Sequence, residues 1–192
     1  MKRRLAIAGI CLSLATGLAL FGEQGYLALK ARYAESLIED AYAAYLDDGG
    51  AHRPWSWADM HPVARLEIPR LGVETTVLAG ASGSSLAFGP GHIDGTAAPN
   101  APGNSVVAGH RDTWFQFLGD VQPGDRLWVE THEGRLAYEV TSRSVRSTWE
   151  GEVVLAQRPG RVLTLVTCWP LDELLPGPDR LVVVAEPVRD SR

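Results

Sequence analysis

The segment RVLTLVTC at residues 161–168 and the segment LVVVA at residues 181–185 decide the fold of this chain. Both are short, apolar and rich in β-branched residues, which predicts buried β-strands. The stretch between them, residues 169–179, contains three prolines and a glycine, so it is expected to be a loop that joins antiparallel neighbours. Pleating would place residues 164, 166 and 168 on one face and residues 163, 165 and 167 on the other.

Outward from this pair, the pattern of short apolar runs continues over most of the chain. Further strands are predicted at residues 65–68, 73–78, 105–108, 127–130, 136–140 and 153–154, with turns at residues 123–125 and 133–134. Residues 79–104 are rich in Gly, Ser, Pro and Ala, which predicts a loop with one helical turn. At least eight short strands at this spacing indicate a closed or nearly closed barrel.

The N-terminus carries a membrane signal. Three basic residues, Lys2, Arg3 and Arg4, precede an uncharged run over residues 5–22. As a helix this run would be about 27 Å long, against a hydrocarbon core of about 30 Å. We therefore expect a single-pass anchor in the cytoplasmic (inner) membrane, with the N-terminus inside and the main domain on the extracytoplasmic side. A cleaved signal peptide is the alternative, although the small residues at 15–17 lie inside the run.

The region after the apolar run predicts a helix and then a linker. Residues 26–46 have apolar positions at helical spacing, and residues 47–50, Asp-Asp-Gly-Gly, would end the helix. This helix is either a stalk or an element packed on the domain. Residues 51–62 read as an extended linker whose indoles pack on the domain or sit at the membrane interface. The expected organisation is an anchor at 1–22, a juxtamembrane helix and linker at 23–61, and a β-barrel domain at 62–192.

Charge and cysteine content narrow the function. The net charge is −5, and no basic run follows the first four residues. Because phosphate binding needs clustered Lys and Arg, we do not expect nucleic acid as a partner. The chain has two cysteines, and Cys11 lies in the apolar run. Cys168 would then be a lone thiol in an oxidising compartment, where structural cysteines normally pair. Such a thiol is either reactive or an accident of burial.

Three chemistry-bearing residues stand at predicted strand ends. His110 follows the strand at 105–108, Cys168 ends the run at 161–168, and Arg180 precedes the strand at 181–185. An adjacent cation stabilises a thiolate, a guanidinium can stabilise the oxyanion of an attacked amide, and an imidazole can protonate the departing amine.

Each of these residues also has an explanation without catalysis. Cys168 could be a core cysteine, His110 could cap a strand, and Arg180 could pair with Asp179 or Asp172. A metal site from His92, His110 and Cys168 has no closely spaced ligand pair to support it, so we expect neither a metal nor a cofactor.

Four ordered motifs resemble those of the sortase family. TLVTC at 164–168 matches the sortase signature of Thr-Leu, any residue, Thr-Cys, and NSVVAGHRDT at 104–113 resembles the histidine segment. ARLEIPRLGV at 64–73 is similar to the first-strand motif, and FGPGHI at 88–93 to the loop before the histidine strand. The resemblance covers about residues 62–188. The segment PWSWAD at 54–59 and the short loop before Arg180 are most like the proteobacterial (class GN) sortases, with class D next.

This resemblance implies an all-β fold, an eight-stranded sortase-type β-barrel. It implies a cysteine transpeptidase that cleaves an LPxTG-like C-terminal sorting signal of a secreted protein between Thr and Gly. The thioacyl intermediate would pass to an amine acceptor of the cell envelope, either a cell-wall precursor or a protein lysine. By position, Cys168 would be the nucleophile, His110 the acid/base and Arg180 the cation beside the oxyanion.

The resemblance also suggests roles for neighbouring residues. Thr167, Val166 and Trp169 would contact the substrate. We expect His92 to stabilise its loop, and Asp112 to be structural or substrate-facing. The family does not suggest a disulfide, in accord with the lone external thiol.

Three rival functions remain open at this stage. A cysteine peptidase on the same fold would resolve the intermediate with water. A non-catalytic, membrane-tethered β-module would have an inert thiol. An L,D-transpeptidase would carry its histidine just before the cysteine in a Ser-His-Gly context, which this sequence lacks.

Overall fold

The computed structural model describes residues 2–147, 154–173 and 177–188, and its chain divides into two compact units. The first unit, Met1–Leu37, holds the larger part of helix α1 (Lys2–Asp48). The second unit, Ile38–Arg192, holds the end of α1 and every described strand. Within the described residues, no helix combines the length and the apolar character needed to cross a membrane. The side chain of Cys11 lies outside the described part.

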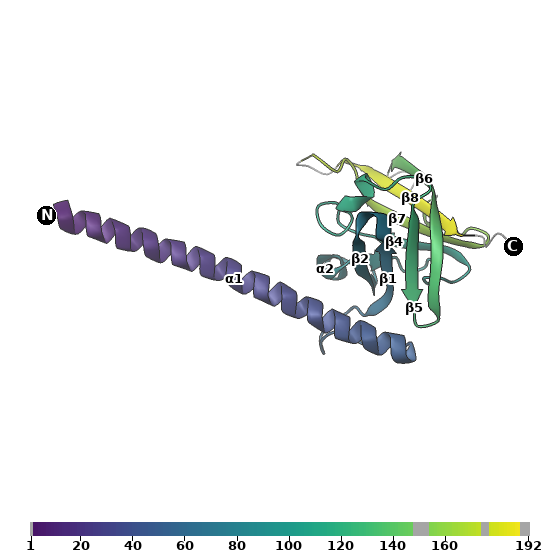
Figure 1. Cartoon of the computed structure of the whole chain (residues 1–192), viewed down its shortest axis with the longest axis horizontal. Coiled ribbons are helices and arrows are strands. Elements are labelled where there is room, and N and C mark those ends of the chain that lie inside the picture. Colours follow the sequence, from purple (N-terminus) through teal and green to yellow (C-terminus); the bar gives the residue numbers. More distant parts are fainter. Residues whose placement is uncertain (1, 148–153, 174–176, 189–192) are drawn as a thin grey trace. The chain divides into compact units, whose positions relative to one another are not determined.

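The second unit is a barrel, and its described strands close in the order β1-β2-β3-β4-β7-β8-β6-β5 (Figure 1). The eight strands are β1 (Pro62–Ile68), β2 (Val73–Ala79), β3 (Gly91–His92), β4 (Gly103–Ala108), β5 (Arg126–Thr131), β6 (Gly134–Ser147), β7 (Arg161–Cys168) and β8 (Asp179–Pro187). The short helices are η1 (Pro69–Leu71), α2 (Gly83–Phe88) and η2 (Gln116–Gly119). The predicted eight-stranded closed barrel is confirmed.

Two strand predictions were wrong in detail. β6 extends to Ser147, well beyond the predicted end at residue 140, because it pairs with β8 along its length and its polar outer positions give no apolar alternation. A strand at 153–154 is not found at Val154, which is helical and packs on outward-facing valines. Val153 lies outside the described residues. The predicted strand at 181–185 is confirmed within β8, which begins at Asp179, and residues 169–173 and 177–178 before it are not in strands, as predicted.

The end of α1 packs against the barrel. Ile38, Ala41, Tyr42 and Tyr45 are buried, and the Arg65 guanidinium lies 4.2 Å from the centre of the Tyr42 ring. Burial, together with Glu130, raises the pKa of Tyr42, so its phenol stays protonated and donates a hydrogen bond to Glu130 (3.1 Å). The helix ends where predicted, since its last residue is Asp48 and Gly49 follows with φ +72°.

The predicted apolar stripe of this helix is only half buried. Ala41 and Tyr45 are in contact with the barrel, whereas Tyr26, Leu29 and Tyr33 are 65%, 69% and 65% exposed. The following linker also divides: Trp55, Ala58 and Met60 join a cluster with Leu78, but Trp57 is 82% exposed.

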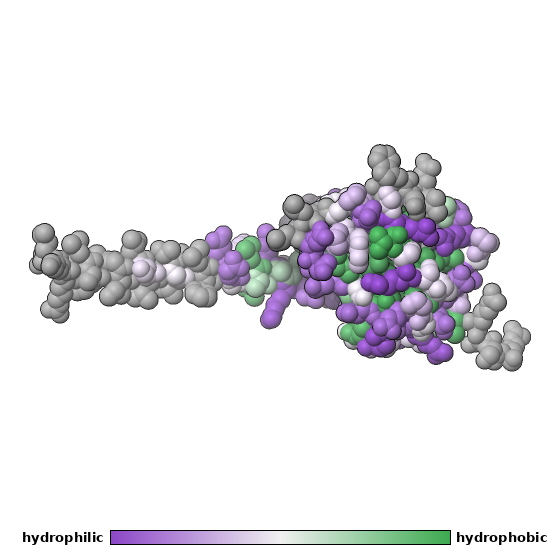
Figure 2. Space-filling view, turned by 90° about the horizontal axis from the view of Figure 1, so that it is seen from above, coloured by the Kyte–Doolittle hydropathy of each residue, from purple (hydrophilic) through white to green (hydrophobic). Residues whose placement is uncertain are grey.

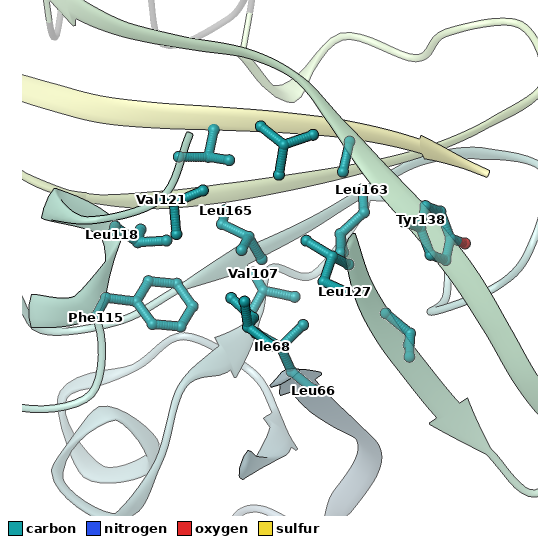
Figure 3. Packing of buried hydrophobic residues seen from close by; sticks show 14 of the residues in the cluster. Leu66, Ile68, Val107, Phe115, Leu118, Val121, Leu127, Tyr138, Leu163 and Leu165 are labelled. Atoms are coloured by element: carbon teal, nitrogen blue, oxygen red, sulfur yellow. The ribbon is translucent and has the colours of Figure 1, made fainter. Parts of the chain in front are cut away.

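The core fills the barrel interior, where side chains from most strands meet the segment after β4. Figure 3 shows Phe115 and Leu118 from that segment facing Leu165, Val107 and Ile68. On the outside of the barrel, the face seen in Figure 2 is mixed, with a small hydrophobic group surrounded by hydrophilic residues. The interior is therefore a packed core, and any site must lie at a rim or on the outer face.

Candidate active site

Three neighbouring strands bring the predicted catalytic residues to one rim of the barrel. In the antiparallel β7–β8 pair, Cys168 stands directly opposite Arg180. Side chains directly opposite in such a pair have Cβ atoms about 5 Å apart. The predicted juxtaposition of Cys168 and Arg180 is therefore present in the fold.

His110 reaches the same rim from the other side of β7. The parallel β4–β7 ladder runs to the pair Ala108–Val166, and the Gly109 N–H continues it with a hydrogen bond to the Val166 carbonyl (3.1 Å). His110 and Cys168 thus each lie two residues beyond the same ladder pair. This register places the exposed His110 at the same rim as the half-buried, unpaired Cys168.

A tight turn fixes the backbone at His110. The Phe115 N–H donates to the His110 carbonyl (2.9 Å), and a Cβ at Gly109 would lie 2.7 Å from the Phe115 ring. Glycine is needed before the histidine because the buried Phe115 packs directly on its backbone. The Ala-Gly-His sequence therefore lets the chain leave β4 and fold Phe115 into the core.

The Arg180 guanidinium is held by its own hairpin loop. Its Nη1 donates to the carbonyl of Asp179 (2.8 Å), with longer contacts to Pro178 (3.3 Å) and Gly177 (3.5 Å). These acceptors are neutral dipoles, so the guanidinium keeps its charge available to an oxyanion at the rim.

The residues next to Cys168 face in different directions. Val166 is half-buried on the outer face with Val162, Val182 and Val184, as the pleat predicted. Trp169 packs against the edge of the main core, and its backbone N–H donates to the Asp179 carbonyl (3.0 Å).

Thr167 lies on the inner face. It is 2% exposed, and its hydroxyl donates to the Gly109 carbonyl (2.7 Å). This burial argues against the predicted substrate contact, because the side chain has no surface to offer a peptide. Its hydrogen bond instead ties the cysteine strand to the residue before His110.

His92 and Asp112 have local partners. The His92 ring lies 2.8 Å from the Ala97 carbonyl and 3.1 Å from the Thr96 hydroxyl, as expected of a histidine that stabilises its loop. Asp112 is exposed and pairs with the neighbouring Arg111 (3.1 Å).

Sequence reasoning missed Arg111, which is buried although it directly follows His110. Its guanidinium donates to the carbonyls of Pro170 and Glu173, the latter at 2.6 Å. A buried charge with such partners links the histidine turn to the loop that follows Cys168. An arginine between a histidine and an aspartate reads as a surface residue, so the sequence offered no signal for this contact.

Asn104 was also missed. Its buried amide donates to the carbonyls of Val154 (2.8 Å) and Ala156 (3.1 Å), and its oxygen accepts from the Thr164 hydroxyl (2.7 Å). Asn104 thereby fastens part of the β6–β7 connection onto β4 and β7. In the sequence, an asparagine beside a glycine indicates a turn. Only the tertiary structure shows that the Asn104 side chain hydrogen-bonds to residues of two other segments.

Comparison with known proteins gives a consistent result. The Sortase domain model matches residues 66–188. The chain is 28% identical over 123 residues to Sortase D of Bacillus subtilis, covering 64% of this chain and 62% of that protein. It is 31% identical over 159 residues to Sortase SrtE1 of Streptomyces coelicolor, covering 73% and 44%. The chain thus spans less than two thirds of the length of either relative.

Solved structures agree with the barrel. A Clostridium perfringens Sortase D5 transpeptidase superimposes with a TM-score of 0.67 over 82% of this chain and 99% of that one, at 24% identity, which bears on the fold alone. Sortase C-1 of Actinomyces oris has a TM-score of 0.61 at 32% identity, covering 79% and 83%. The predicted likeness to class D is confirmed, and the likeness to class GN stays a prediction.

Proposed function

This chain belongs to the sortase family, whose members are cysteine transpeptidases, and we propose that it is itself a membrane-anchored sortase with Cys168 as nucleophile. Its substrate would be an LPxTG-like C-terminal sorting signal of a secreted protein, cleaved between Thr and Gly. The single observation that carries the proposal is the row of strand ends in which Cys168 lies between the His110 segment and Arg180.

In this mechanism the Cys168 thiolate attacks the threonine carbonyl, and the C–N bond to glycine breaks. Negative charge develops on the carbonyl oxygen, where the Arg180 guanidinium on the adjacent strand stabilises it. His110 gives a proton to the departing glycine amine and later takes one from the incoming amine. The glycine amine leaves, and a second amine, from a cell-wall precursor or a protein lysine, attacks the thioester. The new amide forms as the bond to the Cys168 sulfur breaks.

Membrane anchoring is part of the proposal. It is supported by the uncharged run at 5–22 and by the basic residues 2–4 before it. The enzyme would then sit in the cytoplasmic membrane with the N-terminus inside and the barrel outside. That location supplies both a secreted substrate and an envelope amine.

The test is intact-protein mass spectrometry after mixing the purified chain with an LPxTG-type peptide. A mass increase equal to the peptide up to its threonine, absent in Cys168→Ala, is expected. Adding an amine should convert the adduct to an amide product. Release by water at the same rate with and without amine would favour a peptidase, and absence of any adduct with a freely titratable thiol would favour a non-catalytic module.

A further inference from the structure

Arg111 is buried at the candidate site, although the proposed mechanism gives it no part. It directly follows His110 in the chain and is only 5% exposed. An arginine is almost never buried to this degree unless its donors meet acceptors, because an unsatisfied buried charge is costly. The contacts of Arg111 therefore show which parts of the molecule its guanidinium connects.

The guanidinium bridges two carbonyls of the segment that follows the candidate nucleophile. Nη1 donates to the Pro170 carbonyl, and Nη2 donates to the Glu173 carbonyl (2.6 Å). On the side of the histidine turn, Nε lies 3.1 Å from a carboxylate oxygen of Asp112. A planar guanidinium presents its donors in a fixed fork, so this one side chain sets the position of both carbonyls relative to the turn.

The histidine end of this link is fixed by buried structure. The Gly109 carbonyl accepts a hydrogen bond from the Thr167 hydroxyl (2.7 Å), and the His110 carbonyl accepts one from the N–H of Phe115 (2.9 Å), whose side chain is fully buried. The backbone on either side of the imidazole therefore cannot shift without breaking a hydrogen bond. Arg111 thus extends from a turn whose backbone is already held in place.

The other end of the link is docked by its own side chains. Trp169 and Leu171 pack against the main core, and a Cβ added at Gly119 would lie 2.9 Å from Cδ1 of Leu171. The backbone N–H of Trp169 also donates to the Asp179 carbonyl on β8 (3.0 Å). Arg111 connects this docked segment to the turn that carries His110.

We propose that Arg111 is a positioning residue, which holds the turn of His110 against the segment after Cys168 and so sets the geometry of proton transfer to the departing amine. The inference rests on the proposed function. A general acid must lie within hydrogen-bond reach of the leaving nitrogen, and it contributes about 10²–10⁴-fold to the rate. A small misplacement of such a group forfeits part of that factor. In this role Arg111 acts through His110 and does not touch the substrate.

The experiment compares two substrates that differ only in the leaving group. One is an LPxTG-type peptide with its Thr–Gly amide, and the other has a thioester in place of that amide. When the Cys168 thiolate attacks the amide, the C–N bond breaks and the amine must take a proton. When it attacks the thioester, the C–S bond breaks and a thiolate leaves without one.

The readout is the rate of adduct formation with the thioester divided by that with the amide, from single-turnover mass spectrometry of the intact protein. A change in the thiolate content of Cys168 or in the folded fraction alters both rates equally, so it cancels in this ratio. The ratio therefore reports the contribution of the acid, which a purely structural role of Arg111 would leave unchanged.

Arg111→Lys keeps the charge but cannot reproduce the fork, so we expect the ratio to rise about tenfold over the wild type, a part of the 10²–10⁴-fold rise expected for His110→Ala. Asp112→Ala removes the exposed carboxylate beside Nε and should raise the ratio about twofold, as for the loss of a surface ion pair. Because position 112 is exposed, this second variant decides the question if Arg111→Lys does not fold.

The matched control is Arg161→Lys. Arg161 also donates to a backbone carbonyl, that of Asn100 (2.8 Å), but from the first residue of β7, at the far end of the strand from Cys168, so the ratio should stay at the wild-type value. An unchanged ratio in Arg111→Lys, with the rise present in His110→Ala, would overturn the inference and leave the proposed function standing. An unchanged ratio in His110→Ala, or no adduct with either substrate in the wild type, would overturn the proposed function and this inference with it.

Discussion

The two faces of the β7–β8 hairpin share one backbone but differ where the hairpin reaches the rim of the barrel. The inner face presents Leu163, Leu165, Leu181 and Val183, all at most 2% exposed. The outer face and rim present half-buried Cys168 and Arg180. Removing an inner-face leucine should therefore cost stability, and removing a side chain at the outer rim should cost chemistry.

The two faces are also coupled, because alternate residues of a strand belong to opposite faces. A register slip of one residue would turn the leucines outward and carry Cys168 to the inside. The packing requirement of Leu163 and Leu165 thus fixes the orientation of the thiol. In this hairpin, core packing is what positions the candidate catalytic row.

The largest effect is expected at the outer rim. Cys168→Ala should lower the rate of adduct formation at least about 10⁴-fold, since removing a nucleophile leaves only binding and oxyanion stabilisation. The melting temperature should stay within about 2 °C, because a half-buried thiol contributes little packing. Peptide cleavage assays and thermal melts on the same preparation check both. Wild-type cleavage in this variant would refute the assignment of the nucleophile.

Leu165, three positions before Cys168 on the same strand, should show the opposite result: a loss of stability with little change in activity. Leu165 is fully buried in the main cluster, so Leu165→Ala should lower the free energy of unfolding by about 2–5 kcal/mol through lost transfer energy and a cavity. Urea unfolding measures it. The rate per folded molecule should be close to that of the wild type. If kcat fell although the Leu165→Ala protein was fully folded, the inner face would take part in the chemistry.

Arg180 should show a loss of activity of intermediate size. Arg180→Lys keeps the charge but loses the planar guanidinium, whose Nη1 donates to the loop carbonyls, so kcat/KM should fall about 100-fold. Stability should change by less than about 1 kcal/mol, as at a partly exposed site. Steady-state kinetics and urea unfolding separate the two. If the lysine variant were as active as the wild type, a positive charge at position 180 would suffice and the planar guanidinium would not be needed.

The sequence predicted from the pleat which residues of β7 share a face, and Val166 and Leu165 do lie on opposite faces, the first half-buried and the second fully buried. It also predicted the three rim residues, because each adjoins an apolar run. It could not predict Arg111 and Asn104, whose partners are backbone carbonyls about 50 to 60 residues away in the chain. Nor could it predict the length of β6, since a polar strand is recognisable only by its partner β8.

Thr167 lies on the inner face yet hydrogen-bonds to the histidine segment, and it gives the sharpest test of how far the two faces are separate. Thr167→Val removes the buried hydroxyl that donates to the Gly109 carbonyl, which should destabilise the barrel by about 1–2 kcal/mol. Because Gly109 precedes His110, kcat should also fall a few-fold with KM unchanged. Thr167→Ser retains the hydroxyl and should restore kcat, although it loses the methyl packing. If Val and Ser variants lose stability but keep the same kcat, the hydrogen bond serves the fold alone, and the inner face is independent of the site.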